Sequence, residues 1–359
     1  MPTLRTVLAI PALLGLLLAP TTTGDTSAAG ETSAAGDTSA ARATDMVLPL
    51  LTGRDETRAA ALLDRTGTRS HYAAAGRGIA RADHFRAGSI TKTFIAVVVL
   101  QLAAQNRLSL SDPVERYLPG LLRGPGTDGR RITLRALLTH TSGLPDFVQT
   151  TRGTVPLTPL QAVRIALALP PARAGRFSYS STNYVLLGQV IRQVTGRSYA
   201  DEARRRIITP LRLTGTSFPG ARTTLPSPHG RAFAADGSDV TRLDPRVAGA
   251  AGELVTTLAD LDRFYAALLG GRLLPPRRLR EMLDTRATHG LYGMGIFPAK
   301  LPCGITVWGH NGRISGSYVR TAATVDGRRV LTFRVNTDAM ADARLQGSLL
   351  AAEFCPRTR

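Results

Sequence analysis

The sequence predicts a mixed α/β fold, in which helices flank an antiparallel sheet and an all-helical lobe is inserted into the middle of the chain. Three observations lead to this fold class. Strand patterns occur near both ends of the chain, helical patterns fill the region between them, and the last ~60 residues change from a helical to a strand period. With 359 residues, of which 43% are apolar, the chain can bury a substantial core.

The N-terminal residues are predicted to direct export. Residues 1–23 contain Arg5, then an apolar run from Val7 to Ala19 and no acidic residue, which is typical of a secretory signal peptide. An uncleaved membrane anchor is the alternative, but the run is shorter than the ~20 residues that a span requires. No later stretch is long and apolar enough to cross a membrane, so we expect a secreted, extracellular protein.

A six-residue repeat follows the signal. Residues 24–45 repeat GDTSAA with small changes and contain no large apolar side chain, so we expect a flexible tether there. The folded domain is then predicted to cover residues 46–359, with the helical lobe at roughly residues 116–240.

Periodic patterns place the main elements of this domain. The apolar residues that follow Ser89 predict a helix that is buried on most sides and ends near Asn106. A short strand and a turn precede Gly88. Further helical patterns cover residues 132–140, 159–169, 183–195, 200–207, 258–269 and 341–354. Strand patterns cover residues 304–310, 317–325 and 329–336, and Asp326-Gly327 predicts a hairpin turn between the last two.

The chain is strongly basic, with 45 Lys and Arg against 26 Asp and Glu and a formal net charge of +19. The arginines are scattered, without a zinc-finger or an aromatic–basic pattern, so the sequence does not indicate nucleic acid binding. In an exported protein this charge favours attraction to anionic cell-wall polymers, and a solvated arginine-rich surface without a partner is the alternative. No His and Cys spacing suits a metal ion, and we expect no cofactor.

The two cysteines, Cys303 and Cys355, are predicted to form a structural disulfide. A pair of cysteines in an exported chain is most simply explained in this way. Neither lies beside a candidate base in the sequence, which argues against a catalytic thiol.

Ser89 and Lys92 form the first candidate catalytic pair. Only Lys92 and Lys300 are lysines, and the former stands three positions after Ser89 at the start of the buried helix. Residues three apart share one helix face, so the serine Oγ and the amine can meet. A desolvated lysine can lose its proton and then act as a base, which an arginine cannot do. A helix N-cap serine followed by a surface lysine is the alternative.

Two further segments contain candidate site residues. Tyr179 precedes a predicted helix, and we expect Lys92 to lower its pKa so that it serves as base and then acid; a packed tyrosine is the alternative. His310, Asn311 and Gly312 follow a predicted strand, where a glycine lets the strand edge approach a ligand. A histidine in a turn is the alternative for His310.

Together, these pieces resemble the penicillin-recognising serine hydrolases, the group of class C β-lactamases, D-alanyl-D-alanine carboxypeptidases and related esterases. The similar segments occur in family order: FRAGSITKTFIAVVVLQL, LLTHTSGLPD, FSYSSTNYVLLGQVI, ITPLRLTGTSF, AGELVTTLADLDRF and VWGHNGRISGSY. The resemblance covers nearly all of residues 65–354 and implies a β-lactamase/transpeptidase-like fold. It is strongest towards secreted D-alanyl-D-alanine carboxypeptidases, in which cysteines placed like Cys303 and Cys355 pair.

The resemblance also implies roles for the candidate residues. Ser89 would be the nucleophile, Lys92 would hold its proton network, and Tyr179 would relay the proton to the leaving group. The strand-side wall of the site would be formed by His310, Asn311 and Gly312. The backbone N–H groups of Ser89 and Arg313 would form the oxyanion hole.

One position departs from the family pattern. The second motif of the family reads Tyr-x-Asn, whereas this chain has Ser181 in the third place, and we expect this serine to reach substrate only through a water. Asn183 is expected to point elsewhere on its helix, and His140 to support the fold. The Arg313 side chain either pairs with a terminal carboxylate of the substrate or faces solvent.

These expectations describe a serine hydrolase that forms an acyl-enzyme at Ser89. We expect a monomeric D-alanyl-D-alanine carboxypeptidase that acts on peptidoglycan stem peptides and associates with the cell wall. A β-lactamase, an esterase, a D-amino-acid amidase and a catalytically silent binder of cell-wall peptide are the alternatives. A Ser-His-Asp hydrolase is disfavoured because the chain has no Gly-x-Ser-x-Gly elbow.

Overall fold

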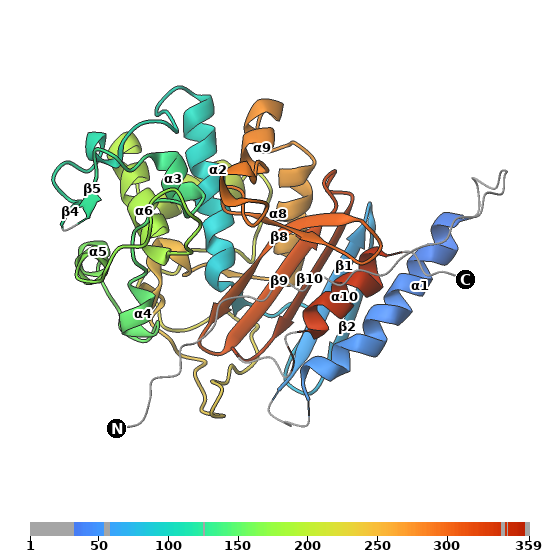
Figure 1. The fold of residues 1–359 in the computed structure, drawn as a ribbon. Coiled ribbons are helices and arrows are strands. Elements are labelled where there is room, and N and C mark those ends of the chain that lie inside the picture. Colours follow the sequence, from blue (N-terminus) through green and yellow to red (C-terminus); the bar gives the residue numbers. More distant parts are fainter. Residues whose placement is uncertain (1–31, 54–57, 125, 339–341, 343, 356–359) are drawn as a thin grey trace.

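The computed structural model of the chain describes residues 32–53, 58–124, 126–338, 342 and 344–355. Figure 1 shows a sheet with two helices on one face and a helical lobe on the other, which confirms the predicted fold class. The predicted signal peptide and the first residues of the repeat lie outside the described residues.

Six antiparallel strands form the main sheet, in the order β2-β1-β10-β9-β8-β7. The strands are β1 (Ala60–Thr66), β2 (Arg69–Ala75), β7 (Phe297–Lys300), β8 (Thr306–Ile314), β9 (Ser317–Ala323) and β10 (Arg329–Val335). The last three follow the strands predicted from the sequence, and the turn at Asp326-Gly327 joins β9 to β10. A small antiparallel pair, β3 (Phe85–Arg86) with β6 (Val255–Thr256), joins a segment that precedes the inserted lobe to one that follows it.

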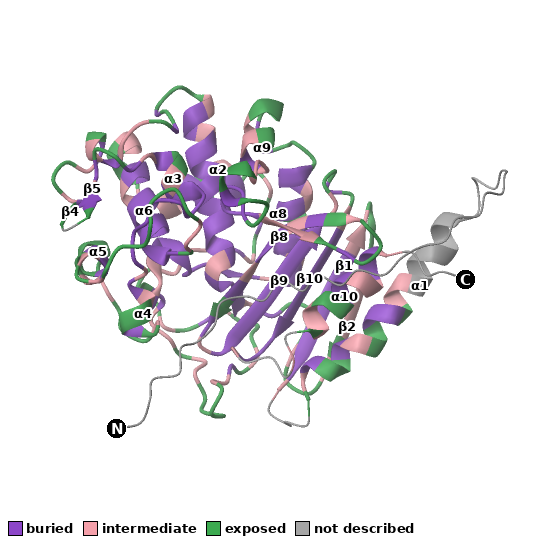
Figure 2. Ribbon diagram, viewed as in Figure 1, coloured by how far each residue is buried: buried purple, intermediate pink, exposed green. Residues whose placement is uncertain are grey.

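The two faces of the sheet pack against different helices. Side chains alternate along β9, so Tyr318 and Ala322 pack with α10 (Leu345–Phe354), whereas Val319 and Ala323 join the core around α2 (Thr91–Ala104). In Figure 2, β9 and most of α2 are buried throughout. Helix α8 (Leu258–Leu269) lies between the sheet and α2, and its Phe264 stacks on Phe94 with ring centroids 3.8 Å apart.

The remaining helices surround α2 and complete the lobe. They are α3 (Leu134–Leu138), α4 (Val148–Thr151), α5 (Pro159–Leu167), α6 (Ser181–Thr195), α7 (Tyr199–Ala203) and α9 (Pro276–Met282). The helix predicted at residues 200–207 is divided into α7 and a π-helical turn, η4 (Arg204–Ile208). Twelve of the fourteen residues of α2 are buried, because its apolar side chains point in all directions and neighbours contact it on every side.

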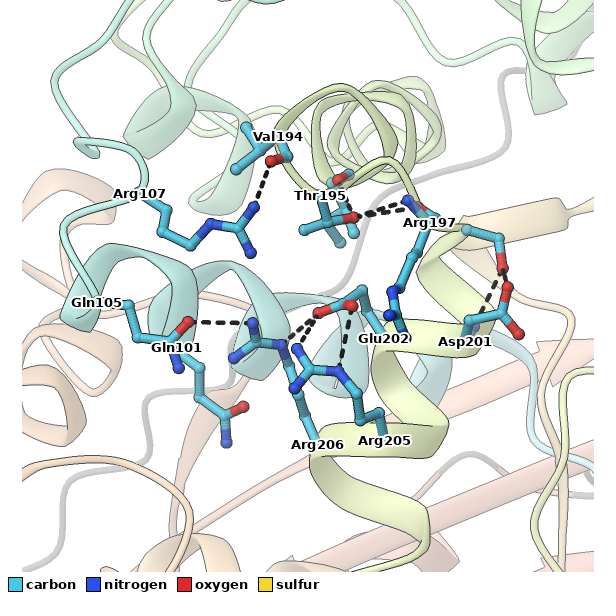
Figure 3. A network of polar contacts seen from close by, with 12 residues as sticks. Gln101, Gln105, Arg107, Val194, Thr195, Arg197, Asp201, Glu202, Arg205 and Arg206 are labelled. Carbon is cyan, nitrogen blue, oxygen red and sulfur yellow. Dashed lines mark hydrogen bonds and ion pairs between the residues drawn. The ribbon is translucent and has the colours of Figure 1, made fainter.

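The lobe is tied to the far end of α2 by a buried carboxylate. Glu202 of α7 accepts hydrogen bonds from Arg205 Nη2 at 2.9 Å and from Arg206 Nε at 2.5 Å, and Arg206 Nη2 also donates to Gln105 Oε1 at 3.0 Å (Figure 3). A buried charge is tolerated only when it is paired, and here two guanidinium groups pair with one carboxylate. This network fixes the C-terminal end of α2, opposite the end that carries Ser89.

The repeat does not remain a tether along its whole length. The sequence predicts flexibility over residues 24–45, but helix α1 (Thr32–Val47) occupies the second part of this stretch and packs against α10. Alanine is the strongest helix former and recurs throughout the repeat, so contact with α10 is enough to stabilise the helix. Ala43 and Thr44 are buried there.

Cys303 and Cys355 form the disulfide that the sequence predicts, with their Cα atoms 5.7 Å apart. The bond joins the turn between β7 and β8 to the C-terminal end of α10. It therefore holds the α10 layer on the sheet.

Candidate active site

Ser89 and Lys92 lie at the N-terminal end of α2. A 3-10 turn, η2 (Gly88–Ile90), leads directly into the helix, so the two side chains are separated by one helical turn. Lys92 Nζ donates a hydrogen bond to Ser89 Oγ at 3.0 Å and another to the backbone oxygen of Ala251 at 2.8 Å. The two side chains meet as predicted, and the lysine is in the core rather than on the surface.

The environment of Lys92 favours its uncharged form. The side chain is completely buried, and this burial lowers the pKa of Lys92 to about 7, while the nearby carboxylate of Asp146 opposes the shift. A large share of the molecules therefore carries a neutral amine at neutral pH. Such an amine can accept the proton of Ser89, to which it is already hydrogen-bonded.

Tyr179 reaches the same point from a distant segment. It stands in the loop before α6, its hydroxyl end lies close enough to Ser89 to interact with it, and Lys92 Nζ lies 4.9 Å from the centre of its ring. The three predicted catalytic side chains thus face one centre. The tyrosine side chain as a whole is 36% exposed, so the centre is open on this side.

The expected effect of Lys92 on Tyr179 is wrong. Burial of the hydroxyl end raises the pKa of Tyr179 above its usual range, and the neighbouring Ser89 side chain only partly opposes this shift. Because Lys92 itself loses much of its charge near pH 7, it cannot stabilise a phenolate. The phenol is therefore protonated at neutral pH and suits an acid or a proton relay rather than a standing base.

His310 is a buried part of the strand wall and does not titrate near neutral pH. Its Nδ1 faces the backbone oxygen of Asn311, which can only accept, so Nδ1 carries the proton and Nε2 accepts from the hydroxyl of Tyr292 at 2.8 Å. Burial lowers the pKa of His310 to about 3. The side chain thus supports the wall through Tyr292.

The backbone of β8 approaches Ser89 closely because glycines occupy both sides of the contact. A Cβ on Gly312 would lie 1.8 Å from the backbone oxygen of Ala87 and 3.1 Å from Ser89 N. A Cβ on Gly88, where φ is +51°, would lie 2.8 Å from Arg313 N. The two N–H groups predicted to form the oxyanion hole, those of Ser89 and Arg313, therefore belong to backbones in direct contact.

Two predicted substrate-binding side chains lie on the wrong face of β8. Asn311 is the register partner of Arg320, which shares a face of β9 with Tyr318, and the Tyr318 hydroxyl donates to Gln346 of α10. Arg313 is the register partner of Tyr318, and its Nη2 lies 3.8 Å from Asp338 Oδ2. Side chains of paired residues share a face, so both point towards α10, and only their backbones belong to the site.

The departure at the second motif has a structural counterpart. Ser181 is the first residue of α6 and is 8% exposed, and its contact with substrate through a water stays a prediction. Asn183 points away, as predicted, and its amide contacts the buried ring of His140 at 3.1 Å. The side-chain amide of Asn183 therefore does not take the place of the asparagine amide that the family has where this chain has Ser181.

The sequence analysis did not identify Asp146, Ala251 or Tyr292 as site residues. The first belongs to the quoted segment LLTHTSGLPD, and its position two residues before α4 is the only available signal. Asp146 Oδ1 accepts the N–H of Val148 at 3.1 Å, and the carboxylate lies near the N–H of Ser181. Burial raises the pKa of Asp146, and Lys92 lies close enough to oppose this shift.

Within the described ranges, no group of three or more His, Cys, Asp or Glu side chains is arranged to hold a metal ion. None of the helices among these residues is long and apolar enough to span a membrane.

A serine hydrogen-bonded to a buried lysine, on a sheet with an inserted helical lobe, is the arrangement of a class of serine hydrolases. Residues 49–352 match the family described as Beta-lactamase, and the chain belongs to this family. PbpX of Bacillus subtilis is 31% identical over 219 residues, which is 60% of this chain but only 54%, about half, of the relative. Penicillin-binding protein 4 of Amycolatopsis lactamdurans is 29% identical over 66% of this chain and 68% of its own length.

Two solved structures are similar over most of the chain. A D-stereospecific amidohydrolase from Streptomyces sp. is 40% identical with a TM-score of 0.82, and the match covers 88% of this chain and 98% of that protein. The D-amino acid amidase from Ochrobactrum anthropi SV3 in complex with D-phenylalanine is 26% identical with a TM-score of 0.76, over 87% and 98% of the two chains.

Proposed function

We propose that this serine hydrolase cleaves amide bonds that follow a D-configured residue, and that it prefers substrates with a free amino group. The likeness to a D-stereospecific amidohydrolase and to a D-amino acid amidase supports the reaction class. The observation that carries the preference is the sign of the charge that acts on the Lys92 amine and the Tyr179 hydroxyl. The Asp146 carboxylate acts on both, whereas the Arg313 guanidinium lies beside Asp338 on the other face of the sheet.

Acylation begins at the pair of Ser89 and Lys92. The neutral lysine accepts the serine proton while Ser89 Oγ forms a bond to the carbonyl carbon of the substrate. The hydrogen bond to the Ala251 oxygen keeps Nζ in line with Oγ. Tyr179 then donates its hydroxyl proton to the leaving nitrogen, the C–N bond breaks, and the lysine proton returns to the phenolate through the hydroxyl network.

The charge that develops on the carbonyl oxygen is stabilised by backbone groups. The N–H groups of Ser89 and Arg313 would donate to this oxygen, and the positive end of α2 adds to the field. Removing one donor of this kind costs about 3–4 kcal/mol of barrier in other hydrolases. The tight contact of Gly88 and Gly312 with the opposite backbones is what brings these two donors together.

Water completes the reaction by attacking the acyl carbon. Its proton passes to the same network, the bond to Ser89 Oγ breaks, and the serine regains its proton, so the acid leaves and the enzyme is restored. A substrate ammonium group would pair with Asp146, since a half-buried carboxylate gains most from an opposite charge.

A D-alanyl-D-alanine carboxypeptidase is the second candidate, because the relatives include Penicillin-binding protein 4. It shares the acylation chemistry but needs to bind a carboxylate rather than an amine. The placement of Arg313 argues against it, since this guanidinium is occupied outside the cleft.

Paired substrates test the proposal. We would measure ammonia release from D-phenylalanine amide, L-phenylalanine amide and N-acetyl-D-phenylalanine amide, and alanine release from an N-acylated peptide ending in D-Ala-D-Ala. The free D-amide should be the best substrate, and acetylation should lower kcat/KM at least about tenfold through loss of the charged pair. Asp146→Asn should remove this difference, and Asp338→Asn should keep it.

Other outcomes would assign the protein elsewhere in its family. Preference for the D-Ala-D-Ala peptide would establish the carboxypeptidase and reject the amidase. If intact-mass measurements after addition of a penicillin show that its adduct forms and is rapidly lost, the protein is a β-lactamase. Undiminished hydrolysis by Ser89→Ala would reject the acyl-enzyme itself.

We further infer that the protein is exported. The pattern of residues 1–23 and the disulfide between Cys303 and Cys355 support this, because disulfides persist in oxidising compartments. Loss of residues 1–23 from the protein recovered outside the cell, read by N-terminal sequencing, tests the inference. Retention of all the chain inside the cell would contradict it.

A further inference from the structure

We propose that His140 positions Tyr179 for proton transfer, as a neutral hydrogen-bond acceptor whose tautomer is set by the backbone N–H of Ser180. The proposal deepens the proposed function and rests on it for its kinetic part. Nothing in the reaction requires this histidine to exchange a proton. Its task is to hold the phenol at the right distance from Ser89.

His140 binds the chain on both sides of Tyr179. Its backbone oxygen accepts the N–H of Ser178 at 2.8 Å, and its ring Nδ1 accepts the N–H of Ser180 at 3.2 Å. The ring itself packs on the ring of Tyr179, with centroids 4.3 Å apart and an angle of 33° between the planes. One residue thus contacts the tyrosine and both its neighbours.

The tautomer of His140 follows from what its neighbours can donate. A backbone N–H can only donate, so the contact with Ser180 requires a lone pair on Nδ1. Asn183 must then present its amide nitrogen to the same atom, at 3.1 Å, and its Oδ1 accepts from Ser142 Oγ at 2.7 Å. Ser142 Oγ in turn accepts the N–H of Leu144 at 3.0 Å, which leaves its own proton for Asn183.

This chain of donors makes His140 a fixed acceptor. The ring proton is on Nε2, which is buried and has no hydrogen-bond partner within the described part of the chain. Burial lowers the pKa of His140, and the charge of Lys92 adds to this shift, so the ring stays neutral over the working range. The backbone adopts φ of +58°, an uncommon value for a residue other than glycine, and thereby turns both the oxygen and the ring towards the tyrosine loop.

Tyr179 gains from this support because its side chain is only partly enclosed, although its ring also contacts Lys92 and Tyr292. Its side chain is 36% exposed, whereas Tyr184 and Tyr292 beside it are buried. A relay that works through proximity is sensitive to placement, and a shift of about 1 Å costs up to about a hundredfold in rate. His140 therefore acts on the rate constant of acylation through the position of the phenol.

Three substitutions separate this role from a merely structural one. In His140→Asn, the side-chain oxygen replaces Nδ1 as acceptor and the residue tolerates a positive φ. His140→Phe keeps a ring but has no hydrogen-bond acceptor. His140→Gly adopts the positive φ without strain but removes both the ring and the acceptor. We expect the Asn variant to acylate within about tenfold of the wild type, and the Phe and Gly variants to be about a hundredfold slower at unchanged KM.

The rates would be measured as single-turnover acylation of the folded protein, with folding checked by circular dichroism. Equal acylation rates for the Asn and Gly variants would overturn the proposal. So would acylation rates that fall only in proportion to the fraction of folded protein. The tautomer is read separately, from the ring nitrogen chemical shifts of the wild type between pH 5 and 9. A proton on Nδ1 would also overturn the proposal.

The nitrogen spectra require no activity. If the wild type forms no acyl-enzyme with any substrate, the proposed function fails, while the tautomer still decides the arrangement proposed for His140. A tautomer on Nε2 together with a slow Asn variant would show that the ring contact with Tyr179, rather than the acceptor, is needed, and would reject the acceptor role.

Discussion

The first turn of α2 differs sharply from the turns that follow it. Thr91, Lys92 and Thr93 are polar and completely buried, and each is hydrogen-bonded: the two threonines donate to the backbone oxygens of Gly88 and Gly295, both at 2.6 Å. From Phe94 to Leu100, every side chain is apolar and buried.

The difference shows how one helix serves two purposes. The apolar turns bury large side chains and supply stability, at about 1.5–3 kcal/mol for each large one. The first turn places an amine in the same dry interior, where its charge is costly, and this cost is what makes the amine a base near pH 7. Four experiments test how stability and catalysis are divided between these turns and how far the site extends, from the largest expected effect to the smallest.

Lys92→Met should separate the two purposes completely. Loss of the base should lower kcat at least about a thousandfold, since removing one member of a catalytic unit costs about as much as removing all. The same variant should be more stable at pH 7 by about 1–4 kcal/mol, because a buried cation is replaced by an apolar chain.

The stability gain should also depend on pH. In the wild type, the pKa of Lys92 is lower in the folded state, about 7, than in the unfolded state, about 10.4, so the unfolded chain binds more protons between these values. Wild-type stability therefore rises from pH 7 to pH 10, and the advantage of the variant shrinks. Urea unfolding at pH 7 and 10 measures this, and a constant difference would contradict the pKa assigned to the lysine.

Phe94→Ala should affect the other part of the helix alone. The ring is buried against Phe264, and its removal should cost about 3–5 kcal/mol of unfolding free energy. Substrate turnover per folded molecule should change little. The matched control is Leu160→Ala in α5, an exposed position where we expect almost no change. A large loss of turnover by the folded variant would show that the apolar turns also shape the site.

The pH profile sharpens the role of the first turn. Because the neutral form of Lys92 is the base, kcat/KM should fall about tenfold for each pH unit below about 7. With the N-acetylated amide, which has no amino group to titrate, it should be flat above pH 8. Glu253 is the control, since burial raises its pKa to about 7 as well and it stands two residues after Ala251. In Glu253→Gln, kcat/KM should still fall below about pH 7. If the fall disappears in this variant, the titrating group is Glu253 and not Lys92.

Arg313→Ala should have the smallest effect. The side chain points away from Ser89 and is two-thirds exposed beside Asp338, so kcat/KM for amide substrates should stay within about twofold of the wild type, as for other exposed pairs. Steady-state kinetics with the D-amide measures this. A tenfold loss would mean that the arginine turns into the cleft when substrate binds.

The sequence predicted those features that depend on local spacing. Ser89 and Lys92 meet because three residues make nearly one helical turn, and Asp326-Gly327 forms a hairpin because of its turn chemistry. The meeting of Tyr179 with this pair rested on the family resemblance, since no local rule connects residues so far apart.

Other features were missed for identifiable reasons. The contact of Asp146 with the site depends on long-range packing, which leaves no periodic signal. The placement of Asn311 and Arg313 was within reach, because residues that alternate with His310 and Gly312 along a strand must face the other way. The helix in the repeat was missed because its low hydrophobicity suggested a tether, although α10 supplies the partner that makes it stable.

The bond between Cys303 and Cys355 makes the stability of the protein depend on where it resides. It spans 52 residues, a loop whose closure stabilises the native state by about 4 kcal/mol in the chain-entropy model. In a reducing compartment this contribution is missing, so the reduced chain should unfold more readily than the oxidised one. Because the bond attaches the C-terminal end of α10 to the turn between β7 and β8, we expect the oxidised protein to resist proteases better than the reduced one.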